Sequence, residues 1–286
     1  MVRRVSIAMA GLAALGGALS VLGPASVADA AQVSHHGLHA SRPGGLRARG
    51  SGARMGKEGV TVSSSTNWSG YSALGTYTSV SSNWTVPTGV CSSGDQYDSS
   101  WVGLDGFTAA SSTVEQTGTE TDCDGKTPAY YAWYEMYPGP SENFSNKVKA
   151  GDKMYASVVY DPAASVRHRS HRGGGGSTSS SKTYTLVLQD ITENWTKTET
   201  ASVKGALNSS AEVIDEAPCC TNSGGILPLT DTTPETFTNA TANGLPIGDA
   251  TDLQETYMAD TKGVTQSSVS ALTGGNSFTV TFVKST

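Results

Sequence analysis

Two neighbouring runs organise this sequence: Ser99-Ser-Trp-Val-Gly-Leu-Asp-Gly-Phe107 and Thr113-Val-Glu-Gln-Thr-Gly-Thr-Glu120. Each run alternates apolar residues with small or polar ones, and a turn separates them, so short strands are predicted at residues 99–105 and 113–118. The second run carries an amide, Gln116, flanked by Glu115 and Glu120. Because strands favour β-branched and aromatic residues, this polar set indicates either one edge of a polar groove or a solvated sheet face.

The rest of the chain repeats this pattern of short strands and turns. It contains 33 Gly, 15% charged residues and 37% hydrophobic residues, which is too apolar for a disordered chain and typical of an all-β protein. No convincing helix interrupts the pattern. The natural packing is an antiparallel β-sandwich of two sheets. Further strands are predicted at residues 77–87, 129–137, 153–160, 183–189, 193–196, 210–216, 235–239, 253–258, 264–272 and 277–283.

Residues 1–30 are predicted to be a secretion signal peptide. Arg3 and Arg4 give a positive start, an apolar run follows from Ser6 to Leu22, and residues 28–30 form an A-x-A cleavage site. A membrane anchor is the weaker alternative, because the apolar run is short and a cleavage site follows it. No later stretch is long enough to span a bilayer. We therefore expect a secreted, extracellular protein that has no membrane contact once it is processed.

Residues 31–60 are predicted to be a basic, disordered pro-segment, because no strand or helix period is present there. Composition alone allows a tail without function almost equally well. Residues 61–286 are predicted to form a single β-sandwich domain. A flexible insertion is expected at 161–182, where Arg167-His-Arg-Ser-His-Arg172 is followed by a run of glycines.

Charge is distributed unevenly along the chain. Residues 1–60 hold seven basic and two acidic residues, whereas the remainder holds 12 basic and 23 acidic residues. An acidic body argues against nucleic-acid binding, although the acidity could also serve solubility alone. The opposite charges suggest that the pro-segment pairs with the body at neutral pH and acts as its inhibitor. As carboxylates become protonated, that attraction fades and the segment can leave.

The four cysteines are compatible with export, where disulfides persist. We predict a Cys91–Cys123 disulfide, which brackets the opening runs. Cys219 and Cys220 are then left to pair with each other or to remain free.

The sequence lacks the motifs of several common catalytic and binding sites, which narrows the reactions that it could catalyse. Only five His are present, three before residue 40 and two in the predicted insertion, so a Ser-His or Cys-His nucleophile is improbable. No HExxH motif and no Cys/His cluster with zinc-ligand spacing occurs. No phosphate-binding glycine loop is present either. We therefore expect no metal and no cofactor, and what remains is carboxylate and amide chemistry.

Alternation along the predicted strands places polar and aromatic side chains together, because alternate strand residues share a face. Three such faces carry acids, an amide and aromatic rings, and they would line a groove if they belong to one curved sheet. Burying unpaired carboxylates is costly, so a solvated outer face remains an equal alternative. The three sets are Val114, Gln116, Gly118 and Glu120; Tyr131, Trp133, Glu135 and Tyr137; and Glu212, Ile214 and Glu216.

Six short pieces resemble the glutamic peptidases, the eqolisin family of acid endopeptidases. They occur in the family's order with similar gaps, from about Thr66 towards the C-terminus, and the resemblance thins beyond Pro218. Each piece is weak alone, whereas six in order are specific. They are Asn67-Trp-Ser-Gly, Trp84-Thr-Val-Pro, Trp101-Val-Gly-Leu-Asp-Gly, Gln116-Thr-Gly, Ala132-Trp-Tyr-Glu-Met-Tyr-Pro138 and Ala211-Glu-Val-Ile-Asp-Glu216.

The resemblance implies a sandwich of two bent, about seven-stranded sheets with a concanavalin/lectin-like jelly-roll arrangement, acting on polypeptide substrates and expected as a monomer. It implies a catalytic pair of Gln116 and Glu216, with Glu216 preferred to Glu212 by motif. Glu216 would activate water as general base and then return the proton, while Gln116 would stabilise the oxyanion. The implied substrate-binding residues are Trp68, Trp101, Asp105, Trp133, Glu135 and Tyr137.

Three features depart from the family pattern. Asp215 stands where an apolar residue is usual and alternates onto the face opposite Glu216, so the strand is predicted to end or bulge there. Tyr131 replaces an acid, and the insertion at 161–182 has no clear equivalent.

Two rival readings remain. A sugar-binding or glycoside-hydrolysing sandwich would use paired carboxylates such as Glu135 and Glu216 and would not need Gln116. A non-catalytic secreted binding module would need neither, and the presence of both Gln116 and Glu216 argues against it.

Overall fold

A computed structural model describes residues 54–55, 59–164, 181–219 and 225–285 of the chain. The predicted signal peptide therefore lies outside the described residues, as do most of the predicted pro-segment and residues 165–180 of the predicted insertion. Among the described residues, no helix is long and apolar enough to cross a membrane.

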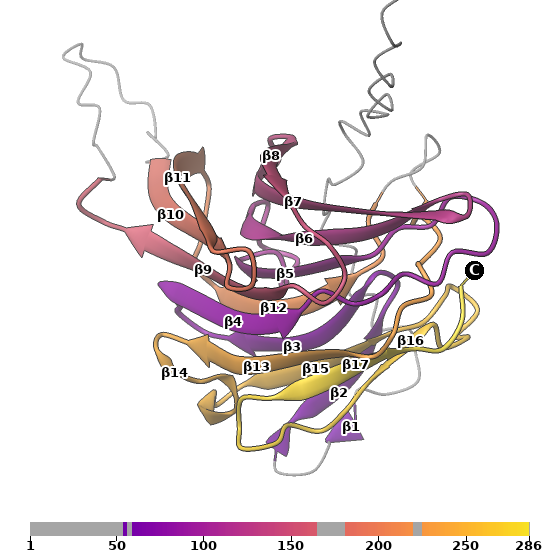
Figure 1. Cartoon of the computed structure of the whole chain (residues 1–286). Helices are drawn as coiled ribbons and strands as arrows, with labels where there is room; N and C mark the ends of the chain where they lie inside the picture. The colour runs from indigo at the N-terminus through magenta and orange to yellow at the C-terminus, as the bar shows by residue number, and fades with distance from the viewer. Residues whose placement is uncertain (1–53, 56–58, 165–180, 220–224, 286) are drawn as a thin grey trace, which may run out of the picture. The chain divides into compact units, whose positions relative to one another are not determined.

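Nearly all regular structure in the described residues is β-strand, as predicted, and it forms two sheets (Figure 1). The first sheet is nine-stranded, and its neighbours are antiparallel except for the parallel pair β2–β15. Its strands, in spatial order, are β1 (Arg54–Met55), β2 (Thr61–Ser65), β15 (Leu253–Met258), β3 (Trp68–Leu74), β12 (Ser210–Glu216), β5 (Ser99–Leu104), β6 (Val114–Asp124), β7 (Thr127–Tyr137) and β8 (Ser141–Lys147).

The second sheet is eight-stranded, and β14 (Leu245–Pro246) joins it by pairing with β13. A short 3₁₀ turn, η2 (Ile247–Asp249), follows β14. The strands in order are β11 (Trp195–Lys204), β10 (Ser181–Asp190), β9 (Lys153–Asp161), β4 (Ser79–Thr85), β13 (Glu235–Ala242), β17 (Phe278–Phe282) and β16 (Ser267–Val269). The family resemblance implied about seven strands in each sheet, so both sheets are larger than expected.

Part of the difference comes from the predicted pro-segment. Arg54 and Met55 form β1 and pair with Val62 and Thr61 of β2. Local composition gave no strand signal there, because a two-residue edge strand needs only backbone partners and no side-chain period. The expectation of disorder throughout 31–60 is therefore wrong at these two residues.

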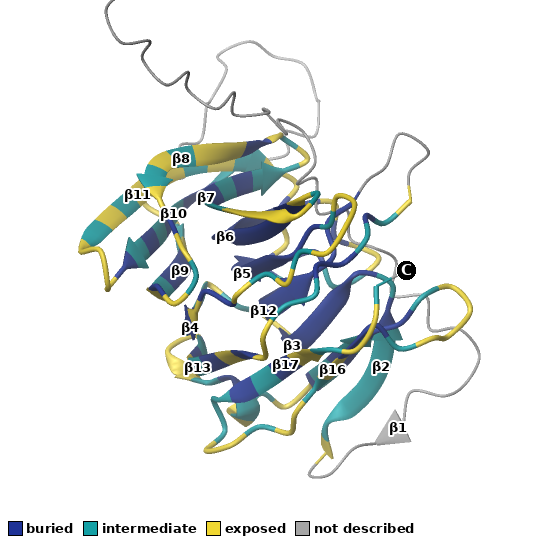
Figure 2. Ribbon diagram, turned by 45° about the vertical axis from the view of Figure 1, so that its right-hand side comes forward, coloured by how far each residue is buried: buried dark blue, intermediate teal, exposed yellow. Residues whose placement is uncertain are grey.

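The two sheets pack face to face around one main core. Alternate residues of strands in both sheets point into it, as expected for a sandwich. Trp84 of β4 also donates a hydrogen bond across the core to Thr119 Oγ1 of β6, at 3.0 Å. Figure 2 shows the result, with β3, β12, β5 and β6 buried and the edge strands β8 and β11 largely exposed. Core residues include Tyr71, Val102 and Val213 from the first sheet and Leu186, Phe237 and Val280 from the second.

The Cys91–Cys123 disulfide is present, with a Cα–Cα distance of 5.5 Å, which confirms the prediction. It ties the loop before β5 to the end of β6 and so brackets the two opening strands. Cys219 is also disulfide-bonded, which removes the free-thiol alternative for that residue. Its predicted partner, Cys220, lies outside the described residues.

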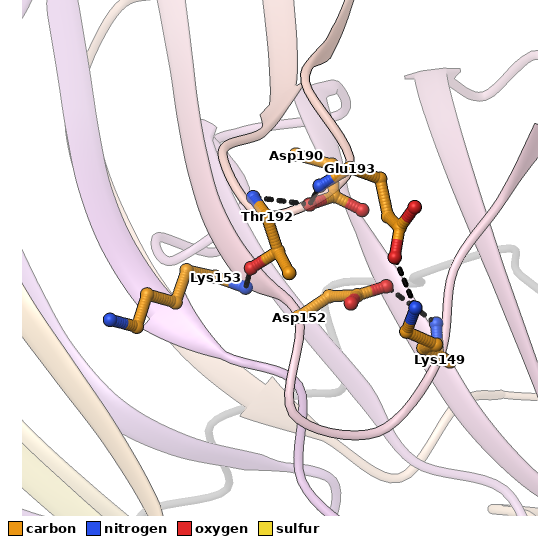
Figure 3. A network of polar contacts seen from close by, with 6 residues as sticks. All are labelled: Lys149, Asp152, Lys153, Asp190, Thr192 and Glu193. Atoms are coloured by element: carbon orange, nitrogen blue, oxygen red, sulfur yellow. Dashed lines mark hydrogen bonds and ion pairs between the residues drawn. The ribbon is translucent and has the colours of Figure 1, made fainter.

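Two loops at one end of the second sheet are held by a polar network (Figure 3). Asp190 accepts hydrogen bonds from the backbone N–H groups of Thr192 and Glu193, both at 2.9 Å. Lys149 pairs with Glu193 across the two loops. Glu193 therefore belongs to a turn, and β11 begins at Trp195, two residues later than predicted.

Candidate active site

The nine-stranded sheet has two chemically different faces. One set of alternate residues joins the main core, and the other forms a second cluster of buried side chains containing Trp68, Trp101, Val114, Trp133 and Ile214. Residues that pair directly across an antiparallel sheet share a face. By that rule the polar residues Gln116, Glu120, Glu135, Glu212 and Glu216 belong to the same side as the second cluster. We call this side the acidic–aromatic face.

All five of those polar residues are buried. The alternative of a solvated sheet face is therefore wrong. Nearly every residue of β5, β6 and β12 is buried.

A single cross-strand row contains the predicted catalytic amide. Glu212 of β12 pairs with Gly103 of β5, Gly103 pairs with Gln116 of β6, and Gln116 pairs with Glu135 of β7. The Gln116 Nε2 atom donates to Glu135 Oε2 at 2.5 Å. This bond fixes how the Gln116 amide lies against its neighbouring strand.

Glu216 lies on the same face but in a different row. It pairs with Ser99, which pairs with Glu120, so it is displaced from the row of Gln116 by four residues along β12. Its two carboxylate oxygens are held separately. Asn67 Nδ2 donates to Oε1 and Trp101 Nε1 donates to Oε2, each at 2.9 Å. Both donors are neutral.

The indole of Trp101 stands between the two predicted catalytic residues. Trp101 lies on β5, the strand between β12 and β6. A Cβ atom placed on Gly103, opposite Gln116, would lie 2.8 Å from Trp101 Cζ3, while the Nε1 atom reaches Glu216. The same indole packs edge-on against Trp68, with ring centroids 5.1 Å apart.

Glycine at position 118 makes this arrangement possible. Gly118 pairs directly with Trp101, and a Cβ atom there would lie 2.1 Å from the Ser100 carbonyl oxygen and 2.6 Å from Trp101 Cβ. Any side chain would push β5 and β6 apart.

The predicted substrate-binding residues separate into two groups. Trp68, Trp101, Trp133 and the half-buried Tyr137 join the second cluster, and Glu135 holds Gln116. Asp105 behaves differently, as it lies just beyond β5 with a φ of 66°. Its carboxylate accepts four hydrogen bonds of 2.7–2.8 Å from the segment 207–209. A substrate would meet this carboxylate only if those bonds broke, so the observed contacts are those of a loop anchor.

Burial raises the pKa of several other acids of this sheet. Burial raises the pKa of Glu212 well above its usual range, and the Asp105 and Glu115 carboxylates raise it further, while the Ser210 hydroxyl acts in the opposite direction. Glu115 points to the core side, and burial, helped by Asp105, raises its pKa to about 8. Burial likewise raises the pKa of Glu120 well above its usual range.

Asp215 belongs to a third group of acids, between the two sheets. The strand neither ends nor bulges there, because β12 keeps an unbroken register through Glu216, so that expectation is wrong. The side chain is buried close to Asp98 and Glu235, and burial raises the pKa of all three carboxyl groups, that of Asp215 to about 6. A hydrogen bond between Asp98 and Asp215 makes this core-facing acid possible.

Asn67 is the functional candidate that sequence reasoning missed. In the sequence it is only the first residue of one of the six pieces that resemble the glutamic peptidases, and its Asn-x-Ser pattern is also that of a glycosylation acceptor. Its side chain is fully buried against Glu216. Among the described residues, no group of three or more His, Cys, Asp and Glu is arranged to hold a metal ion.

Comparisons with known proteins agree with the fold and the motifs. The peptidase A4 family model matches residues 66–168. Aspergillopepsin-2 of Aspergillus niger is 28% identical over 243 residues, covering 77% of this chain and 78% of that protein. Scytalidopepsin B of Scytalidium lignicola is 36% identical over 121 residues, covering 42% and 44%.

A solved structure supports the same fold. Scytalido-glutamic peptidase with a transition state analog inhibitor aligns with a TM-score of 0.59 and 24% identity, covering 76% of this chain and 98% of that one. At that identity the likeness speaks for the fold alone. The sequence matches and the six motifs support a peptide-bond hydrolase that is similar to the peptidase A4 family, the glutamic peptidases or eqolisins.

Proposed function

We propose that the protein is a secreted endopeptidase in which Glu216 activates water and Gln116 stabilises the oxyanion. One observation carries this proposal. On the same buried face as Gln116, the Glu216 carboxylate is held at both oxygens by neutral donors, Asn67 and Trp101. Hydrogen bonds donated to a carboxylate favour its charged form, and two donors also fix its orientation.

The reaction has two proton transfers. Glu216 as carboxylate removes a proton from a water molecule, and the water oxygen forms a bond to the carbonyl carbon of the scissile peptide. The carbonyl oxygen gains negative charge, towards which Gln116 directs an N–H. When the tetrahedral intermediate collapses, the C–N bond breaks and protonated Glu216 gives its proton to the leaving amine. An oxyanion donor of this kind contributes about 3–4 kcal/mol to transition-state stabilisation.

Glu212 is a weaker choice for the general base although it shares the row of Gln116. A base must be ionised to accept a proton, and hydrogen bonds donated to a carboxylate favour its charged form. Glu216 receives two such bonds. Burial and the neighbouring acids raise the pKa of Glu212 instead, which favours its protonated form.

The substrate class is polypeptide, and the acidic–aromatic face supplies the contacts. Tyr137 is partly exposed and offers a flat apolar surface for substrate side chains, and the buried Trp68, Trp101 and Trp133 belong to the same cluster. Glu135 acts on the amide of Gln116 rather than on a charge of the substrate. The rival sugar-hydrolase reading would make Glu135 and Glu216 a carboxylate pair, and it gives no role to Gln116.

The basic segment 31–60 is proposed to inhibit the enzyme until the pH falls. At neutral pH its positive charge pairs with the acidic body, and protonation of the body's carboxylates weakens that attraction. The full chain should therefore mature faster at pH 3–4 than at pH 7. Equal maturation rates at the two pH values would contradict acid-triggered release.

The test of the active site compares two substitutions with two matched controls. Glu216→Gln and Gln116→Ala should each lower kcat/KM on an unfolded protein substrate at acid pH by about 100-fold or more. Glu142→Gln, an exposed change on β8, and Gln189→Ala, on β10, should leave activity unchanged. Full activity in either Glu216→Gln or Gln116→Ala, in protein that is folded by circular dichroism, would refute the proposed pair.

A further inference from the structure

The turn between β2 and β3 reaches into the site through one side chain. Asn67 is the residue before β3, and its side chain is fully buried. Its Nδ2 atom donates to Glu216 Oε1 at 2.9 Å across 149 residues of sequence. Strand pairing explains the approach, because Trp68, the next residue, pairs directly with Glu216.

The orientation of the Asn67 amide is fixed by a second side chain. Ser65 Oγ donates to Asn67 Oδ1 at 3.1 Å, which leaves the Nδ2 end directed at Glu216. Ser65 Oγ is itself held, since it accepts from the backbone N–H groups of Asn67 and Trp68 at 3.3 and 3.1 Å. The three side chains form a buried chain of hydrogen bonds that ends on one oxygen of Glu216.

We propose that Asn67 is a positioning residue, oriented by Ser65, that keeps Glu216 ionised and aimed for the attack of water. This inference rests on the proposed function of Glu216. Trp101 holds the other oxygen, so the carboxylate is fixed in one plane by two donors. Neither an amide nor an indole takes up a proton in the acid range, and the proton removed from water therefore stays on Glu216 until the leaving amine accepts it.

Other titratable groups near Glu216 come from neighbouring strands. Glu120 of β6 shares its row, and Tyr131 of β7 lies one strand further. Tyr131 donates to Asp122 at 2.8 Å. Asp98 and Asp215 belong to the cluster on the other side of the sheet. A change at Asn67 acts on Glu216 directly, because it removes the hydrogen bond to Oε1.

The test replaces Asn67 with Ala and measures the pH profile of kcat. Losing a donor disfavours the carboxylate, so the acid limb, where the base becomes ionised, should move upward by about one pH unit. We expect kcat to fall by about 10- to 100-fold and KM to change by less than about threefold, since the proposed effect of Asn67 on the reaction runs through Glu216. Ser65→Ala should shift the acid limb in the same direction by a smaller amount.

Asn83→Ala is the matched control. Asn83 also precedes a Trp, but it lies on β4 and donates to the Met154 backbone oxygen at 3.2 Å. This variant should lose some stability and keep the parental pH profile.

The outcomes separate this inference from the proposed function. An unchanged acid limb in Asn67→Ala, with Glu216→Gln inactive, would overturn the positioning role alone. If Asn67→Ala fails to fold, Ser65→Ala serves as the test instead. An unchanged acid limb in the pH profile of Ser65→Ala would then overturn the positioning role. An active Glu216→Gln enzyme would instead remove the proposed function, and the positioning role with it.

Discussion

Two groups of buried carboxyl groups lie back to back on the two sides of the nine-stranded sheet. On the acidic–aromatic face, Glu216 receives hydrogen bonds from two neutral donors. On the core side, one residue earlier on the same strand, Asp215 has Asp98 and Glu235 as neighbours, and its pKa is raised to about 6 by burial. Burial is the same in both places. What differs is the hydrogen-bond partners, which are neutral side chains for Glu216 and another carboxyl group for Asp215, so burial by itself does not identify a catalytic acid.

The largest expected difference between the two groups should appear when Glu216 and Asp215 are neutralised one at a time. Glu216→Gln should lower kcat/KM by about 100- to 10,000-fold, because it removes the proposed proton acceptor. Asp215→Asn should change kcat/KM by less than about threefold at acid pH, where Asp215 is protonated and an amide resembles the acid. Steady-state assays on one unfolded protein substrate measure both. Comparable losses in the two variants would mean that the core-side cluster takes part in catalysis.

A second prediction concerns the buried acids whose pKa values are raised by burial. Unfolded Asp and Glu have pKa values of about 3.9 and 4.3, whereas burial raises the pKa of Asp215 to about 6 and that of Glu115 to about 8. Between the unfolded and folded values the native state holds more protons, so stability is full below about pH 4 and is lost as pH rises towards 8. Thermal melts from pH 4 to 8 should show Tm falling by about 10 °C or more.

A Tm that rises or stays level over this range would contradict the assignment of protonated buried acids. The chain should be measured with its disulfides intact, because their loss would destabilise the protein at every pH.

A third prediction isolates one member of the core-side cluster. Asp215→Asn removes a group that must ionise as pH rises, so it should stabilise the protein at pH 7 by about 1–3 kcal/mol. It should leave stability at pH 4 nearly unchanged. Asp124→Asn, an exposed change at the end of β6, serves as the control and should have little effect at either pH. Denaturant unfolding at the two pH values gives the comparison. Equal effects of Asp215→Asn at pH 4 and pH 7 would show that its ionisation is not the cause.

The smallest expected effect concerns Glu212, which shares a face with Glu216 but has neighbouring acids like Asp215. If Glu212 is protonated during turnover, Glu212→Gln preserves its shape and hydrogen-bonding capacity. We expect kcat/KM to fall by less than about tenfold. A loss as large as that of Glu216→Gln would make Glu212 the proton acceptor and would reverse the assignment of the two residues.

Much of the fold was predictable from local pattern. The runs at 99–105, 129–137 and 210–216 are strands in the structure, with bounds that differ by a few residues at most. Period-two alternation placed Gln116 and Glu216 in two separate sets of face-sharing residues, and the strand register brings the two sets onto one face. The Cys91–Cys123 disulfide was predictable because these two cysteines flank the two opening strands. Strand numbers were not predictable, because edge strands such as β1 and β8 depend on backbone partners rather than on side-chain period.

The environment of each acid could not be read from the sequence in the same way. Asp215 looked like a sign of a broken strand, but Asp98 and Glu235 approach it from a loop and from the other sheet. Asp105 looked like part of the substrate wall, but the segment 207–209 occupies its carboxylate. In both cases the partner lies about a hundred residues away in the sequence or in the other sheet. The alternation of residues along one strand carries no information about such a partner.

The sequence by itself determined the strand alternation, the uneven charge, the paired cysteines and the acidic and amide residues that the chemistry needs. Only the tertiary structure decided which carboxylate receives two neutral donors, since Asn67 and Trp101 reach Glu216 across 149 and 115 residues. The physical reason is that alternation fixes the face on which a side chain lies, whereas ionisation depends on the donors and charges within a few ångströms. Those neighbours are set by strand order and register.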